Sequence, residues 1–125
     1  MLDHITLHVS DFTKAKEFYT KALLPLDYAM TSDFPEWSVA GYGVNGKPDL
    51  WLHADEFKQA GHIAIAAQSK EAVDLFYKAA LEAGAKDNGA PGYRKQYAPG
   101  YYAAFVIDLD GHNLEAVYHD PNPTA

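Results

Sequence analysis

The feature that most constrains the fold of this chain is an internal repeat at a fixed offset of 58 residues. The segments that begin at His4 and His62 read HITLHVSDFTKAKEFYTKAL and HIAIAAQSKEAVDLFYKAAL, and they align without a gap. A His-Ile pair at the start and a Phe-Tyr pair in the middle recur in the same register. We therefore predict two copies of one supersecondary unit, unit 1 over about residues 1–56 and unit 2 over about residues 60–120.

Each copy has the pattern of a strand followed by a helix. In residues 4–9 and 62–67 apolar side chains alternate with polar or small ones, and this period of two predicts a strand. Ser10 and Ser69 are the expected helix caps, because a serine hydroxyl accepts a hydrogen bond from the first helical turn. Pro25 and Gly84 are expected to end the two helices.

Further strands are predicted over 26–31, 36–42 and 48–53 in unit 1, and over 101–108 and 112–119 in unit 2. The last two strands form a hairpin around the turn Leu109-Asp110-Gly111, and residues 85–100 hold one short strand and a long loop. Each unit is thus β-α-β-β-β. The predicted fold is α+β, a single domain over residues 1–125 in which the two tandem units form a curved mixed-sheet cup with the helices on its outer face.

The alternation of side chains along a strand predicts a cavity wall. If Ile5 and Leu7 face the helices, then His4 and Thr6 face the other side, and such a face is too polar for an ordinary core. In the last strand Glu115 stands between apolar neighbours, where an unpaired buried carboxylate is costly. Metal coordination is one way to offset that cost, because two imidazoles and one carboxylate are a recognised ligand set for a divalent ion.

These residues resemble a known family. His4 in DHITLHVSD, His62 in AGHIAIA and Glu115 in FVIDLDGHNLEAV resemble the metal-ligand positions of the vicinal oxygen chelate superfamily, which includes glyoxalase I, extradiol dioxygenases and the fosfomycin- and bleomycin-resistance proteins. The resemblance implies a cup around one divalent metal ion, with iron, manganese, nickel, zinc and cobalt all open. It also implies a homodimer in which each cup combines units from two subunits.

The sequence departs from glyoxalase I at one ligand. The fourth ligand of that enzyme, a glutamate, falls at Trp51, so the remaining three-ligand set is more similar to that of the dioxygenases and the fosfomycin-resistance proteins. Because Arg94 is the only arginine, the chain matches the cation-rich fosfomycin group poorly. We expect a small metal-dependent lyase or dioxygenase that acts on a small oxygen-chelating substrate. The alternative is a metal-free protein that sequesters a small molecule, as in the bleomycin-resistance branch.

Other side chains are candidates for the same cavity. His8 and His53 are candidate proton-transfer groups, with plain polar wall residues as the alternative. Arg94 lies in the glycine- and proline-rich segment AKDNGAPGYRKQYAPG, where it would suit a small carboxylate or phosphate, unless the loop is simply solvated. The remaining candidate substrate contacts are Trp51, Tyr97 and Tyr102, whereas His112 and His119 are expected to be exposed.

Composition excludes several classes of function. A net charge of −7 disfavours a nucleic-acid partner. The lack of cysteine excludes disulfides and thiolate metal sites, and is consistent with a cytoplasmic protein. No apolar run has the length of a membrane span.

Overall fold

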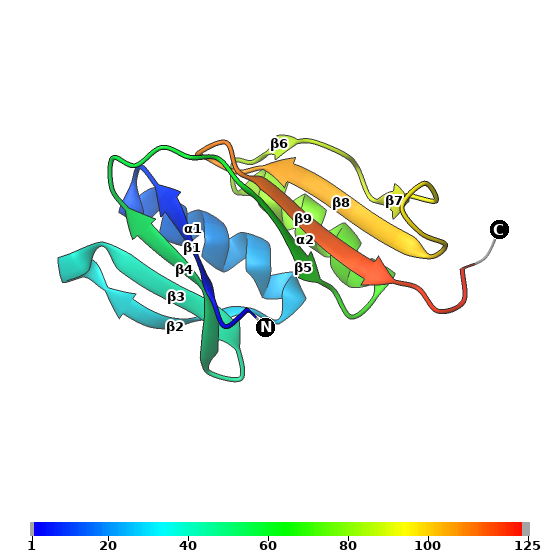
Figure 1. Ribbon diagram of the computed structural model, residues 1–125, viewed down its shortest axis with the longest axis horizontal. Coiled ribbons are helices and arrows are strands. Elements are labelled where there is room, and N and C mark those ends of the chain that lie inside the picture. Colours follow the sequence, from blue (N-terminus) through cyan, green and yellow to red (C-terminus); the bar gives the residue numbers. More distant parts are fainter. Residues whose placement is uncertain (1, 124–125) are drawn as a thin grey trace.

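The computed structural model describes residues 2–123 and places two similar units side by side (Figure 1). Unit 1 consists of β1 (Ile5–Val9), α1 (Phe12–Leu23), β2 (Ala29–Phe34), β3 (Val39–Val44) and β4 (Lys47–Ala54). Unit 2 consists of β5 (His62–Ala66), α2 (Lys70–Glu82), β6 (Lys86–Asp87), β7 (Gly92–Tyr93), β8 (Tyr101–Ile107) and β9 (Asn113–His119). The predicted α+β fold with two tandem units is confirmed.

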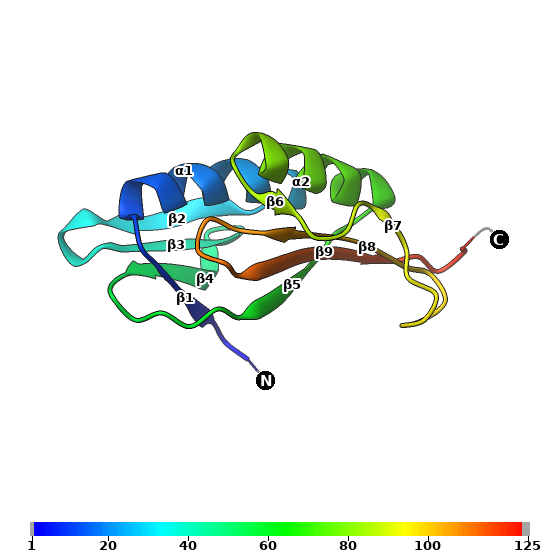
Figure 2. The same cartoon turned by 90° about the horizontal axis from the view of Figure 1, so that it is seen from above.

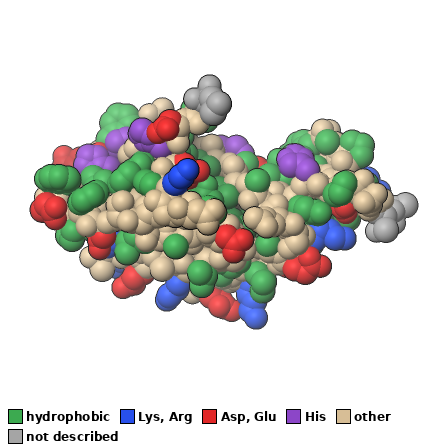
Figure 3. Space-filling view, turned by 90° about the horizontal axis from the view of Figure 1, so that it is seen from below, with side chains coloured by type: hydrophobic (Ala, Val, Ile, Leu, Met, Phe, Trp, Pro, Cys, Tyr) green, Lys and Arg blue, Asp and Glu red, His purple; other side chains and the backbone are tan. Residues whose placement is uncertain are grey.

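Each unit has its own mixed sheet. The strand orders are β1-β4-β3-β2 and β5-β9-β8-β6, and β7 pairs with β8. In both units the first strand pairs in parallel with the last, and the other pairings are antiparallel. Both helices lie on the same side of the sheets, where α1 packs against α2 (Figure 2). On the side away from the helices the surface is hollowed between the units, and histidine side chains lie on both sides of the hollow (Figure 3).

The alternation predicted from the sequence determines which side chains form the core. Leu7 and Val9 of β1, and Ile65 of β5, point toward the helices and are less than a tenth exposed, whereas His4, Thr6 and Ala64 are exposed. The repeated Phe-Tyr pair also packs in the core, where Phe18 and Phe76 are almost fully buried. Neither helix within residues 2–123 has the length and apolar character needed to cross a membrane.

Several predicted boundaries were wrong by a few residues, each for a local reason. The side chain that caps α1 is that of Asp11 and not Ser10, because the Asp11 carboxylate accepts the hydrogen bond of the Lys14 amide. The strand predicted from residue 26 begins at Ala29, after a 3₁₀ turn over Leu24–Leu26. The strand predicted from residue 36 begins at Val39, after a second 3₁₀ turn over Pro35–Trp37. The long loop contains two two-residue strands rather than one.

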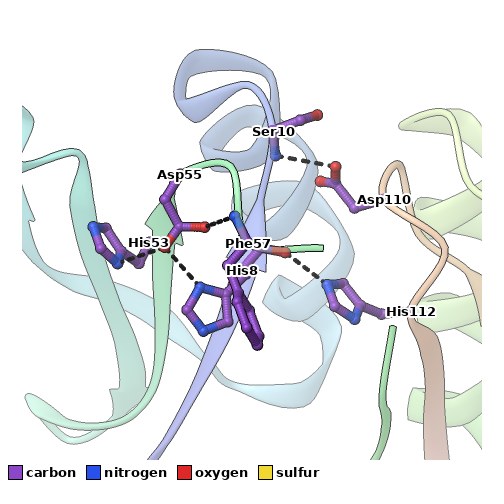
Figure 4. Close-up of polar contacts among 7 residues, drawn as sticks. All are labelled: His8, Ser10, His53, Asp55, Phe57, Asp110 and His112. Carbon is purple, nitrogen blue, oxygen red and sulfur yellow. Dashed lines mark hydrogen bonds and ion pairs between the residues drawn. The ribbon is translucent and has the colours of Figure 1, made fainter. Parts of the chain in front are cut away.

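His112 is buried, so the prediction that it is exposed was wrong. Its side chain is 3% exposed and lies where the two units meet (Figure 4). The Gly61 amide donates to Nδ1 at 3.0 Å, and Nε2 lies 2.8 Å from the carbonyl oxygen of His8. Because a carbonyl only accepts, Nε2 carries the proton and the imidazole is neutral. Both ring nitrogens are thus used to join β1 of unit 1 to the start of β5.

We predict that His112→Ala lowers the free energy of unfolding by about 2–4 kcal/mol, because it leaves a buried amide and a buried carbonyl without partners. Urea denaturation would measure the loss. The matched control is His119→Ala, which truncates an exposed histidine at the end of β9 and is expected to cost less than about 0.5 kcal/mol. Equal effects of the two substitutions would contradict the role assigned to His112.

Candidate functional site

The first candidate centre is a histidine–carboxylate pair in unit 2. Glu115 of β9 lies beside Ala64 in the sheet, one strand away from His62. Its carboxylate is 2% exposed, and Oε1 lies 3.1 Å from His62 Nε2, while half of the His62 side chain is exposed at the hollow. The pair therefore joins a deeply buried acceptor to an imidazole that is open to solvent.

The hydrogen bonds of His62 determine what occupies the space between the pair. His62 Nδ1 lies 3.1 Å from the Asn113 carbonyl oxygen and must donate to it. In a neutral imidazole, Nε2 then carries a lone pair that faces the lone pairs of Glu115 Oε1. Either a proton or a cation must lie between these two acceptors. Ligand atoms bound side by side to one divalent ion at about 2.0–2.2 Å lie roughly 3 Å apart, so the observed spacing fits a metal ion.

Tyr101 of β8 holds the other oxygen of the carboxylate. Its hydroxyl donates to Glu115 Oε2. Burial, together with the hydrogen bond to Glu115 and its charge, raises the pKa of Tyr101 to about 12. The phenol therefore stays protonated around neutral pH, orients the carboxylate and leaves Oε1 directed at His62. This is the supporting contact that a metal-binding carboxylate ordinarily has.

Phe105 and Arg94 extend this centre across the sheet. Phe105 lies directly opposite Glu115 in the β8–β9 hairpin, and its ring stacks near the His62 ring with centroids 6.3 Å apart. The Arg94 guanidinium lies 5.3 Å above the Phe105 ring. Its two terminal nitrogens donate to the Gly92 and Ala90 carbonyls at 2.8 Å each. Arg94 thus fixes its own loop, and each terminal nitrogen keeps one further N–H for a ligand.

His4 does not join the pair within one chain. It lies beyond the start of β1, where Nδ1 contacts Asp3 Oδ2 at 2.7 Å. It lines a pocket with Trp51 and Thr6 on the open face of unit 1. Within residues 2–123, the group of three candidate ligands whose atoms lie within 4.8 Å of one another is His8, His53 and Asp55, not His4 with the pair.

The sheet registers show that Trp51 occupies the position equivalent to Glu115. Thr6 pairs with Trp51 in unit 1, and Ala64, which the repeat aligns with Thr6, pairs with Glu115 in unit 2. The indole lies over Gly41, where an added Cβ would come within 2.7 Å of the ring. The same position of the duplicated frame therefore holds a carboxylate in unit 2 and an aromatic surface in unit 1.

The remaining candidate residues lie in different parts of the structure. Tyr97 is exposed, and its ring contacts the Tyr101 ring edge-on with centroids 5.2 Å apart. Tyr102 donates to Asp74 of α2 at 2.6 Å and so lies on the helix side of β8, away from Glu115. His8 and His53 both contact Asp55, at 2.8 and 3.1 Å. Their part in proton transfer stays a prediction.

Sequence reasoning missed Tyr101, Phe105 and Asp55. The hairpin turn at Leu109-Asp110-Gly111 was predicted, and its register alone would have placed Phe105 opposite Glu115 and Tyr101 on the same face. Asp55 follows His53 by two residues, and a strand continued by one residue beyond Ala54 would have placed the two side chains on one face. Asn113, whose Oδ1 is buried without a hydrogen-bond partner, had no such signal.

Comparison with known proteins agrees with the fold. Residues 1–116 match the sequence profile of the Glyoxalase/Bleomycin resistance protein/Dioxygenase superfamily. A glyoxalase/bleomycin resistance protein from Albidiferax ferrireducens T118 is 24% identical, with a TM-score of 0.80 over 93% of this chain and 97% of that one. A glyoxalase/bleomycin resistance protein/dioxygenase family enzyme from Burkholderia phytofirmans PsJN is 17% identical, with a TM-score of 0.70 over 94% and 98% of the two chains.

The glyoxalase I of Zea mays, crystallised as an E144Q mutant, is also similar. It is 20% identical with a TM-score of 0.69, and the match covers 93% of this chain but 46% of that one. No curated protein sequence matches the chain. The chain belongs to the Glyoxalase/Bleomycin resistance protein/Dioxygenase superfamily, as the resemblance predicted.

We predict that Tyr101 ionises near pH 12 and that Glu115→Gln moves its titration toward the ordinary value of about 10. Because the folded-state pKa is raised, the stabilisation is complete below pH 10 and is lost as the pH rises toward 12. The near-ultraviolet difference spectrum between wild type and Tyr101→Phe isolates this tyrosine from the others. A Tyr101 titration that is unchanged in Glu115→Gln would contradict the contact.

Proposed function

We propose that this protein is a divalent-metal-dependent enzyme of its superfamily that acts on a small oxygen-chelating substrate as a lyase or a dioxygenase. The proposed ligands are His62 and Glu115 of one chain and His4 of a second copy. The observation that best supports this proposal is that two hydrogen-bond acceptors, His62 Nε2 and Glu115 Oε1, face each other at a distance of 3.1 Å. The buried carboxylate needs a positive partner, and a divalent ion meets that need while keeping positions open.

Once bound, the ion would supply Lewis acidity toward two neighbouring substrate oxygens, or a site for oxygen activation. The chain itself does the positioning. Tyr101 fixes the Glu115 carboxylate and the Asn113 carbonyl fixes the tautomer of His62, so that both groups direct a lone pair to one point. Phe105 and the indole of Trp51 offer flat apolar surfaces for the substrate, and Arg94 offers positive charge to an anionic group.

A second copy of the chain is proposed because each chain contributes only part of the site. In each unit the first strand is the edge of its sheet, and β1 and β5 border a pocket that contains His4 and Ala64. Unpaired strand edges are covered in stable proteins, often by a second subunit. A homodimer would cover these edges and bring His4 of one copy to the pair of the other.

The alternative function is a metal-free binding protein. The same 3.1 Å spacing between His62 and Glu115 is also that of an ion pair in which the proton lies on Nε2. In that case the hollow would sequester a small molecule without chemistry. Metal content separates the two functions.

We predict that protein purified without a histidine tag retains a divalent ion that depends on the pair. His62→Ala and Glu115→Gln should each weaken this binding by more than about 100-fold, since the loss of a ligand exceeds the effect of its supporting partners. Elemental analysis after dialysis against zinc, nickel or cobalt measures it, and His119→Ala is the control. If both variants bind metal as wild type does, the metal-free function is favoured. Oxygen uptake with catechols would separate a dioxygenase from a lyase.

We predict that two inactive variants complement each other in a mixed dimer. Co-expressed His4→Ala and His62→Ala chains form mixed dimers in which one site carries both changes and the other site carries none. With random pairing, half of the dimers are mixed and one of their two sites is intact, so about a quarter of the His62–Glu115 sites should bind metal. Metal analysis of the mixture against each variant alone gives the result. No recovery, or a monomer mass by light scattering, would overturn the shared site.

A further inference from the structure

The open face of unit 1 carries a second cluster of potential ligands at the opposite end of β1 from His4. His8 of β1 pairs directly with His53 of β4, and Asp55 follows immediately after the last residue of β4. Both imidazole Nδ1 atoms are directed at one oxygen of Asp55, Oδ2, at 2.8 Å from His8 and 3.1 Å from His53 (Figure 4). All three ligating atoms lie within 4.8 Å of one another.

The cluster is held in place by the surrounding backbone. Asp55 Oδ1 accepts the Phe57 amide at 3.0 Å, so that Oδ2 is left for the histidines. The Phe57 ring packs against His8 with centroids 4.7 Å apart. The carbonyl of His8 is tied to His112 of unit 2. These contacts restrict both the carboxylate and one imidazole, which is how proteins orient metal ligands.

The space beside the cluster is suitable for a metal ion with open positions. The three side chains are between a quarter and a half exposed. His8 and Asp55 also line a cavity of about 420 Å³ between the units, which Gln59 and Asp110 border as well. Water or a small anion could complete the coordination from there. His112 is not available as a fourth ligand because both its nitrogens are bonded to the backbone.

We propose that His8, His53 and Asp55 form a second metal site, selective for late first-row divalent ions such as zinc or cobalt. Two imidazole nitrogens and one carboxylate oxygen suit these ions and not magnesium or calcium, which prefer oxygen ligands. The Nδ1–Oδ2 spacings of 2.8 and 3.1 Å are close to the roughly 3 Å between neighbouring ligands of one ion. Binding displaces any Nδ1 proton and replaces the His8–Asp55 hydrogen bond and the His53–Asp55 contact with metal–ligand bonds. The net charge of −7 favours the binding of a cation.

The test removes the first proposed site so that the second is measured alone. Untagged Glu115→Gln protein is titrated with zinc by calorimetry and with cobalt by visible absorption. We expect one zinc per chain in this background, and at least a tenfold loss of affinity when Asp55→Asn is added. Asparagine keeps an oxygen that can accept the Phe57 amide, so the local fold is preserved. The matched control is Glu56→Gln, which removes the same charge at the adjacent, exposed residue.

The zinc and cobalt titrations either support the second site or exclude it. If the Glu115→Gln background binds no zinc, or if Asp55→Asn and Glu56→Gln bind it equally, the second site does not exist and the cluster is a set of hydrogen bonds. His53→Ala in place of Asp55→Asn gives an independent reading, since it should also abolish the cobalt absorption. The comparison of wild type with Glu115→Gln reports on His62 and Glu115 alone, so failure of one site is distinguishable from failure of the other.

Discussion

The arrangement of the two units depends on the tight turn over residues 108–112. Asp108 is 6% exposed, and its Oδ1 accepts the amides of Asp110 and His112 at 2.9 and 2.8 Å. Its other oxygen accepts the hydroxyl of Tyr19 from α1. Burial and the nearby Asp108 charge raise the pKa of Tyr19 well above its ordinary value, so the tyrosine remains a donor. One buried carboxylate thus shapes the β8–β9 turn and joins it to the helix of unit 1.

The same turn makes further bonds to unit 1, and through them it positions the site. Asp110 accepts the Ser10 amide at 3.0 Å, and His112 bonds the His8 carbonyl. Gly111 adopts φ +90, a conformation that glycine allows at little cost. Since β9 begins immediately after this turn, its register with β5 and β8 places Glu115 beside Ala64 and Phe105, where its carboxylate contacts His62 and Tyr101. The DLDGHNLE segment therefore has a structural role in its first half and carries a proposed metal ligand, Glu115, at its end.

The sequence was sufficient for the repeated frame but not for how its side chains are paired. The gapless offset between His4 and His62, together with the alternation of β1 and β5, predicted the units, the core face and the hollow. What it could not predict was the partner of each polar group. His112 looked like an ordinary turn residue, because its two hydrogen-bond partners are far away in the sequence. The Gly61 amide is 51 positions away and the His8 carbonyl is 104 positions away. The 3₁₀ turns before β2 and β3, which moved the strand starts, end at residues with positive φ, 65 at Asp27 and 55 at Ser38, a conformation that is uncommon for residues other than glycine.

Duplication also explains why the two clusters of potential ligands lie at different positions along the equivalent strands of the two units. The repeat aligns His8 with Ala66, and the registers pair His8 with His53 but Ala66 with Val117. Unit 1 therefore has imidazoles where unit 2 has small apolar side chains. Two residues earlier on the same face, the potential ligand is in unit 2 instead: unit 1 has Trp51 there, and unit 2 has Glu115. Because strand partners on one face are about 5 Å apart, a change at a single register position is enough to add or remove a ligand without disturbing the core. The open faces of the two units can thus diverge in chemistry while the helix-facing residues keep the shared fold.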